Sequence, residues 1–430
     1  MQATAGSHQY GKALTVLTSL FFMWGLITSL NDILIPHLKA IFSLTYLQAA
    51  LIQFCFFTAY FVVSFPAGFI IRKIGYKRGI VLGLVTAGLG CLLFYPAAGA
   101  QSYPFFLSAL FILAGGITIL QVAANPYVTV LGRPETASSR LNLTQAFNSL
   151  GATLGPLLGA VTILAVAAPA AGAQASAQAA AVQTPYLVLA GLLFLLALII
   201  GMVQLPVIKE AEGTDEVARA QEERVHGKKS VWEFRHLVLG ALGIFAYVGA
   251  EVGIGSFLVS LMGQPQIAGL SPESAGKYLS IYWGAAMVGR FAGSALMTRI
   301  NPARILTVNA LINVVLITAA MLVGGKTAMW ALIAVGLFNS IMFPTIFSLA
   351  LKGLGSFTSE GSGILCMAIV GGAIVPVVQA ALADHLGILA SFAVPLVCYL
   401  YIVHFGARGH RELVGQKKPA DRRAPVVQGA

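Results

Sequence analysis

The segment GATLGPLLGA (151–160) has a near copy, GGAIVPVVQA (371–380), which lies 220 positions further along the chain. A single match of glycines or prolines means little, because both residues are common in membrane helices. Three more matched pairs are separated by 218 or 219 positions: Pro126 with Pro344, Asp32 with Glu251, and Gln121 with Asn339. Four matches at nearly one separation indicate an internal repeat, so the sequence predicts two related halves.

The composition predicts that both halves lie in a membrane. The chain of 430 residues is 58% hydrophobic and only 10% charged, whereas a soluble domain carries about 25% charged residues. A run of about 20 apolar residues is long enough to cross a bilayer as a helix. Twelve such runs lie at 14–38, 46–71, 79–98, 103–132, 140–166, 185–206, 237–262, 275–298, 305–323, 328–351, 362–386 and 390–407. We therefore expect an all-α integral membrane protein with twelve transmembrane helices in two pseudo-symmetric six-helix bundles.

A charged segment divides the two predicted bundles. Residues 207–236 contain 13 charged side chains in 30 positions, a density typical of a solvated linker. We interpret them as a cytoplasmic linker between an N-terminal bundle (1–206) and a C-terminal bundle (237–408). A basic tail, 409–430, follows and is also expected to be cytoplasmic.

The distribution of basic residues predicts the orientation of the chain. With the N-terminus inside, the inner segments hold 22 lysines and arginines and the outer segments hold three. Such a bias is the positive-inside pattern of membrane proteins. Both termini are therefore expected in the cytoplasm, in a multi-pass protein of the plasma membrane (the inner membrane of a bacterium). The net charge of +11 then records topology and contact with the inner leaflet, and it does not imply nucleic acid.

Two acidic residues, Asp32 and Glu251, lie well inside predicted spans. A charge at the bilayer centre costs at least about 2.5 kcal/mol, so such a group faces water, finds a partner or binds a proton. We predict that both are proton-coupling residues. Two plainer interpretations stay open for Asp32: it caps a helix break, or it pairs with Arg290, which lies within a span. Glu251 has the alternative of a hydrogen bond to a neighbouring helix, and Arg290 that of snorkelling towards the membrane surface.

Uncharged polar residues recur at helical spacing in several predicted spans. Stripes of this kind must face protein or water, because lipid offers no hydrogen bonds. Hydrogen bonds between helices, worth about 0.6 to 2 kcal/mol each, explain one or two amides but not several converging stripes. Carboxamides match the hydroxyl groups of a neutral sugar, and aromatic faces can cover its C–H groups. The predicted substrate-binding residues are Asn31, Gln121, Asn125, Gln145, Asn148, Trp24, Tyr247 and Asn339.

Four segments resemble the fucose/glucose/galactose proton-symporter family of the major facilitator superfamily: LNDIL (30–34), QVAANPYVTVLG (121–132), LNLTQAFNSLGA (141–152) and FPTIFSL (343–349). The resemblance extends over the membrane part, about 12–408. It implies the major facilitator fold and proton-driven sugar import, with Asp32 at the position of the family's membrane-embedded aspartate. It also places Gln145 and Asn148 at positions that line the sugar cavity.

Two departures from the family pattern matter. The fucose branch carries a glutamate where this chain has Gln121, and a glutamine cannot exchange a proton. Gln121 therefore shifts the expected substrate from fucose towards glucose, galactose or N-acetylglucosamine. In the loop GFIIRKIGYKRG (68–79), Arg72 replaces the aspartate that is usual in the superfamily, so a conformational latch that relies on that aspartate is not expected.

The sequence therefore predicts proton-coupled import of a neutral monosaccharide, most simply a hexose of the glucose/galactose type, by alternating access. The alternatives are a sodium-coupled or uncoupled sugar transporter, or a fucose or N-acetylglucosamine transporter of the same family. We expect a monomer in the lipid bilayer that binds sugar and proton (with Na+ as the alternative ion), without a cofactor, metal or nucleic acid. An enzyme is not expected, because the seven histidines are scattered along the chain.

Overall fold

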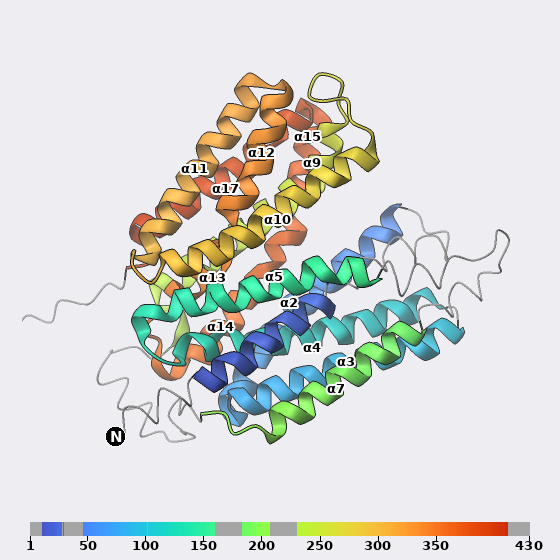
Figure 1. Ribbon diagram of the computed structural model, residues 1–430, viewed down its shortest axis with the longest axis vertical. Helices are drawn as coiled ribbons and strands as arrows, with labels where there is room; N and C mark the ends of the chain where they lie inside the picture. The colour runs from blue at the N-terminus through green and yellow to red at the C-terminus, as the bar shows by residue number, and fades with distance from the viewer. Residues whose placement is uncertain are drawn as a thin grey trace, which may run out of the picture.

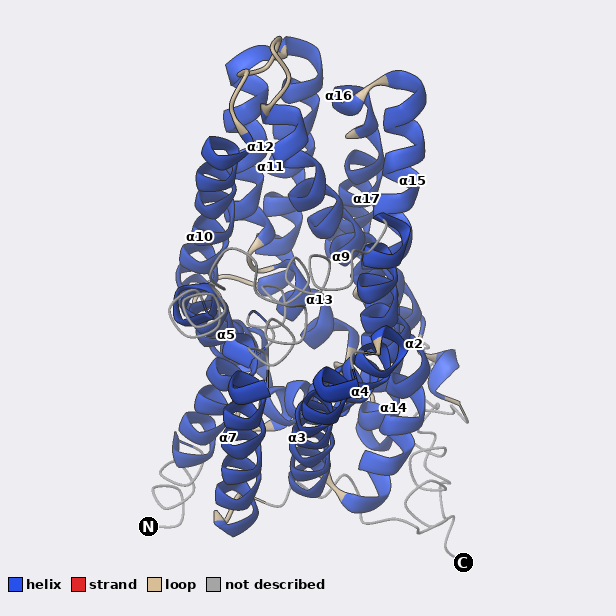
Figure 2. Ribbon diagram, turned by 90° about the vertical axis from the view of Figure 1, so that its right-hand side faces the viewer, coloured by secondary structure: helices blue, strands red, loops and turns tan. Residues whose placement is uncertain are grey.

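The structure is a computed structural model that describes residues 11–27, 29, 46–100, 102–159, 183–206 and 230–411. Within these residues it contains helices and short connections but no strand (Figures 1 and 2). The predictions for Asn31 and Asp32 lie outside the described residues. Most of the predicted linker and tail also lies outside them.

The described helices fall into two groups, which we call the N-half (residues 11–206) and the C-half (residues 230–411). The N-half contains Gly11–Ile27, α2 (Tyr46–Ile74), α3 (Tyr76–Ala100), α4 (Tyr103–Val130), α5 (Ala137–Gly159) and α7 (Gln183–Met202). The C-half begins with α9 (Arg235–Met262), α10 (Pro272–Leu296), α11 (Pro302–Val323), α12 (Gly325–Asn339) and α13 (Met342–Ala350). It ends with α14 (Thr358–Met367), α15 (Gly371–Leu386), α16 (Ile388–Ser391) and α17 (Ala393–His404).

The helices of the C-half begin and end at residues that suit helix termini. Ser271 and Asn301 cap α10 and α11 with their side chains, and a proline follows each cap at the first helical position. Proline is favoured there because its missing N–H would have no partner in the helix. Gly324, with a φ of 67°, ends α11 and starts the turn into α12. These local signals separate neighbouring spans of the hydrophobic sequence.

Eight helical segments among the described residues are long and apolar enough to cross a membrane. The helices α5 and α10 are not among them, although both were predicted as spans. Both carry polar side chains along the contact between the halves; Ser139 of α5 and Ser294 of α10, for example, exchange hydrogen bonds. Their lower hydropathy therefore reflects a position between the halves.

Close helix packing within the N-half depends on glycine. A Cβ atom at Gly90 of α3 would lie 2.4 Å from the backbone nitrogen of Leu113 on α4. A Cβ atom at Gly116 of α4 would lie 2.2 Å from the backbone nitrogen of Ala87 on α3. These helices therefore pack backbone against backbone, as small residues allow in membrane helices.

The halves contact each other along two pairs of surfaces: α5 packs against α10 and α13, and α14 packs against α2 and α4. Figure 1 shows α14 beside the helices of the N-half. The hydroxyl groups of Ser138 on α5 and Ser348 on α13 lie 2.7 Å apart. The contacts join the halves near the ends that the charge pattern predicts to be cytoplasmic.

Three of the predicted spans are not continuous helices; the last of them, over 390–407, is divided between α16 and α17 at Phe392. The span over 328–351 is divided between α12 and α13, and that over 362–386 is divided by a 3-10 turn, Ala368–Val370. Pro344 lies next to the first break, and proline cannot donate to the carbonyl four residues earlier. By contrast, α4 continues through Pro126. At the start of the C-half, α9 begins at Arg235, so the last two residues of the predicted linker are helical.

Candidate functional site

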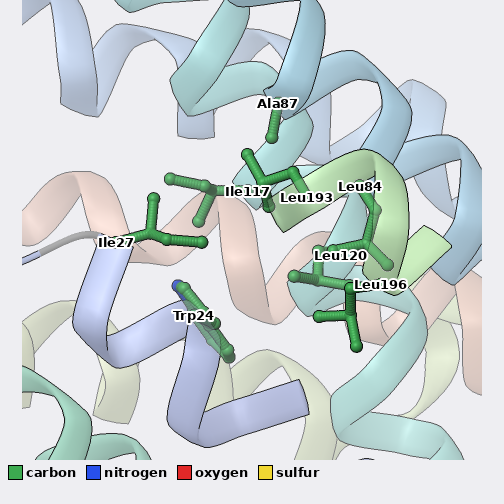
Figure 3. A pocket seen from close by; sticks show the side chains of 8 residues that line it. All are labelled: Trp24, Ile27, Leu84, Ala87, Ile117, Leu120, Leu193 and Leu196. Atoms are coloured by element: carbon green, nitrogen blue, oxygen red, sulfur yellow. The ribbon is translucent and has the colours of Figure 1, made fainter. Parts of the chain in front are cut away.

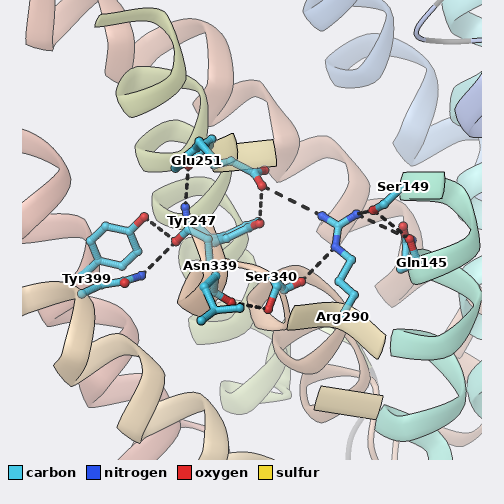
Figure 4. Close-up of polar contacts among 11 residues, drawn as sticks. Gln145, Ser149, Tyr247, Glu251, Arg290, Asn339, Ser340 and Tyr399 are labelled. Atoms are coloured by element: carbon cyan, nitrogen blue, oxygen red, sulfur yellow. Dashed lines mark hydrogen bonds and ion pairs between the residues drawn. The ribbon is translucent and has the colours of Figure 1, made fainter. Parts of the chain in front are cut away.

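Glu251 lies on α9 inside the C-half, at the centre of a polar cluster (Figure 4). The hydroxyl of Tyr247, one turn earlier, donates to Oε1 of Glu251 at 2.6 Å. Nη2 of Arg290, on α10, lies 4.0 Å from the same oxygen. Both charged side chains are 15% exposed. The carboxyl group therefore has a hydroxyl and a guanidinium as neighbours, and it keeps limited access to the surface.

Arg290 connects Glu251 to the N-half. Its Nε donates to the backbone carbonyl of Ser340 at 3.0 Å. This carbonyl is free because the residue four positions later is Pro344, which has no N–H. On the other side, Nη1 donates to the hydroxyl of Ser149 on α5, and to the carbonyl of Gln145 at 3.5 Å. Among the described residues, Arg290 pairs with Glu251; the pairing of Arg290 with Asp32 that the sequence left open lies outside them.

Asn339 is held by three partners within the C-half. Its Oδ1 accepts from Nδ2 of Asn313 at 3.0 Å and from the hydroxyl of Tyr399 at 2.5 Å. Its Nδ2 donates to the hydroxyl of Tyr282 at 2.9 Å. The residue is 1% exposed. Most of its hydrogen-bonding capacity is therefore used inside the protein, which leaves little for a substrate.

The matching amide of the N-half, Gln121 on α4, is less fully paired. Its Nε2 donates to the hydroxyl of Tyr60 at 2.8 Å, and Oε1 has no hydrogen-bond partner among the described residues. One turn later, Oδ1 of Asn125 accepts from Nε2 of Gln145 at 3.3 Å, while its Nδ2 has no partner there. An acceptor and a donor thus lie unused on one face of α4. Buried groups of this kind need a partner, such as water or a ligand.

The structure brings Gln121, Asn125 and Gln145 together, but it places two other predicted residues elsewhere. Nδ2 of Asn148 donates to the carbonyl of Phe21 at 2.9 Å and joins α5 to the first helix. Trp24 lines an apolar pocket inside the N-half (Figure 3), rather than the polar cluster of Figure 4. Substrate binding by these two residues stays a prediction.

Several residues of the cluster were not predicted from the sequence. Tyr282, Tyr399 and Asn313 surround Asn339, although they belong to α10, α17 and α11. A polar aromatic residue in the middle of a span is a weak sequence signal for such a contact, because tyrosine is also common at membrane interfaces. No group of three or more potential metal ligands is present among the described residues.

The family model of the Major Facilitator Superfamily matches residues 16–369. The chain belongs to the Major Facilitator Superfamily. As a member of this superfamily it is a multi-pass membrane transporter and not an enzyme. The prediction of the superfamily and of its all-helical fold is confirmed.

Relatives within the superfamily match nearly the whole chain. A glucose/galactose transporter of Brucella abortus is 56% identical over 408 residues, which cover 95% of this chain and 96% of the relative. The L-fucose-proton symporter of Escherichia coli is 36% identical over 413 residues and 93% of each chain. A crystal structure of FucP in the outward conformation has a TM-score of 0.85 at 35% identity, covering 93% of this chain and 99% of that one.

Proposed function

We propose that the protein imports a neutral hexose of the glucose/galactose type together with a proton, by alternating access. The unused acceptor of Gln121 and the unused donor of Asn125, buried one turn apart, carry this proposal. Sugar hydroxyl groups both donate and accept, so they satisfy both groups at once. The similar proteins named as glucose/galactose transporter and L-fucose-proton symporter support a sugar and a proton as the two ligands.

In the proposed mechanism, protonation removes the cost of a carboxylate in the membrane. Asp32 and Glu251 are the proposed proton-coupling residues, and Gln121, Asn125 and Gln145 the proposed sugar-binding ones. Accumulation requires that the fully loaded and empty forms change conformation readily, while singly loaded forms do not. The two bundles, divided at 207–236, then move about the site as units.

The described contacts between the halves fit an outward-facing state. They include the Ser138–Ser348 contact near the ends predicted to be cytoplasmic. The similar FucP structure is in the outward conformation. We further propose that the protein is a monomer in a bacterial inner membrane, with both termini in the cytoplasm.

Uptake into membrane vesicles tests this function. Labelled glucose, galactose, fucose and N-acetylglucosamine are supplied with and without an inward proton gradient, in sodium-free buffer. We expect glucose or galactose to accumulate only with the gradient. Asp32→Asn is expected to keep exchange of sugar between the two sides and to lose accumulation. A second series adds sodium. Accumulation seen only in the presence of sodium, or equilibration that ignores the proton gradient, would contradict proton coupling.

A further inference from the structure

We propose that Arg290 is a positioning residue that links the charge of Glu251 to the sugar-binding amides of the N-half. This role presupposes the proposed function, because it concerns the coupling of its two ligands. In this role the Arg290 side chain contacts Glu251, the ionisable group of the C-half, and also α5 of the N-half.

One edge of the Arg290 guanidinium is anchored. Its Nε donates at 3.0 Å to the Ser340 carbonyl, which Pro344 leaves free. A backbone carbonyl does not titrate, so this acceptor stays in place whatever the protonation of the neighbouring side chains. The two Nη atoms are therefore the part of the guanidinium that moves in response to the charge of Glu251.

The Nη atoms face opposite halves of the protein. Nη2 lies 4.0 Å from Glu251 Oε1, which is within ion-pair range but too long for a direct hydrogen bond. Nη1 donates to the hydroxyl of Ser149 and lies 3.5 Å from the carbonyl of Gln145. Because the guanidinium is planar and rigid, a rotation that brings Nη2 closer to Glu251 also moves Nη1 relative to α5.

The contact on α5 leads directly to the candidate sugar site. The Gln145 carbonyl and side chain belong to one residue, and the side chain donates to Oδ1 of Asn125 at 3.3 Å. That bond leaves Nδ2 of Asn125 as the unused donor. A shift of α5 at Gln145 therefore changes the position of the amide that we propose binds sugar.

Glu251 is the acidic partner of this arrangement. The titratable groups around it are Tyr247 on α9, Arg290 and Tyr282 on α10, and Tyr399 on α17, and Arg290 is the one cation among these described neighbours. An ionised Glu251 attracts the guanidinium towards the C-half. A protonated Glu251 releases it, so that its donors turn to the acceptors of α5. By linkage, sugar bound at α5 must then alter the proton affinity of Glu251 by the same factor.

Equilibrium sugar binding as a function of pH tests this role in the purified full-length protein in nanodiscs, with labelled glucose and galactose as probes. The wild type is expected to change its affinity about tenfold between pH 6 and pH 8. Arg290→Lys keeps the positive charge but loses the planar fork, so we expect the pH dependence of sugar affinity to fall to about threefold, which is the part that Asp32 contributes. Arg299→Lys, which changes an exposed arginine just beyond the end of α10, is the matched control and is expected to match the wild type.

The outcomes separate this role from the function itself. A wild-type pH dependence in Arg290→Lys overturns the role of Arg290 and leaves sugar–proton symport intact. A wild-type pH dependence in Glu251→Gln also overturns it, because another group must then titrate. If the sugar affinity of the wild type does not depend on pH, and sugar equilibrates regardless of the proton gradient, both the role of Arg290 and the proposed symport are overturned. If Arg290→Lys does not fold, Ser149→Ala serves as the second variant, because it removes the hydroxyl on α5 that accepts from Arg290. A reduced pH dependence of sugar affinity in Ser149→Ala supports the role of Arg290, and an unchanged one overturns it.

Discussion

Arg72, in the last turn of α2, forms an ion pair with Glu360, in the first turn of α14, and so joins the two halves. Each charge lies at the helix end whose dipole stabilises it. The helices also meet closely here: a Cβ atom at Gly68 would lie 2.8 Å from the carbonyl oxygen of Ser359. The resemblance to the superfamily implied an aspartate at position 72, and the chain has an arginine there. The ion pair therefore connects the last turn of α2 to the first turn of α14, with the basic residue on α2 and the acid on α14.

Changing the charge of one member of this pair should open the contact between the halves, and exchanging both charges should restore it. Arg72→Glu places two acids together, so we expect the closed end to open more often, by about tenfold or about 1.4 kcal/mol. Glu360→Arg should act similarly, and the double exchange should return towards the wild type. The measurement is the rate at which an impermeant maleimide labels Ser139→Cys in inside-out vesicles, in a background without the four native cysteines.

The control for this experiment is Lys73→Glu, which makes the same charge change at the exposed neighbour of Arg72. It should leave the labelling rate unchanged. Equal labelling in all variants, or a double exchange that labels as fast as either single change, would show that the ion pair does not hold this end closed.

Tyr60 is expected to orient Gln121 for the sugar. Its hydroxyl accepts from Nε2 of Gln121 at 2.8 Å, which points Oε1 away as the unused acceptor. Tyr60→Phe removes that partner, so the amide loses its fixed orientation. We expect the KM for hexose uptake to rise about tenfold, equivalent to a lost hydrogen bond of about 1.4 kcal/mol. The control is Tyr95→Phe, at an exposed tyrosine of α3, which should leave the KM unchanged. An unchanged KM in Tyr60→Phe would refute the prediction.

Asn339 and Gln121 occupy matched positions of the repeat but should respond differently to truncation. Asn339→Ala leaves three buried partners without their hydrogen bonds, so we expect a loss of about 3 kcal/mol in stability. Gln121→Ala removes one internal bond, to Tyr60, and should lower sugar affinity more than stability. Thermal unfolding and sugar binding in the same detergent preparation measure both effects. A stable Asn339→Ala protein with weakened sugar binding would instead assign Asn339 to the substrate, as the sequence predicted.

The repeat and the spans could be predicted because they depend on local patterns of hydropathy, glycine and proline. Pro344 accordingly lies beside a break between two helices. The same pattern did not predict the outcome at Pro126, where α4 stays continuous. At both prolines a tertiary partner satisfies the carbonyl that is left free: the Ser340 carbonyl accepts from Arg290, and the Val122 carbonyl accepts from Ser362. Contacts between residues so far apart in sequence leave no local signal in a single chain.

The bond to Val122 can be tested by a double-mutant cycle. The hydroxyl of Ser362 on α14 donates at 2.9 Å to the Val122 carbonyl, which lacks its helical partner because residue 126 is proline. Ser362→Ala should therefore lower stability by about 1 to 2 kcal/mol, because a buried carbonyl loses its donor. Pro126→Ala supplies a backbone N–H to that carbonyl, so the same serine change should cost much less in this background. Unfolding midpoints of the four proteins give the coupling energy. Additive losses would mean that Ser362 stabilises the contact between α14 and α4 without satisfying the carbonyl that Pro126 leaves free.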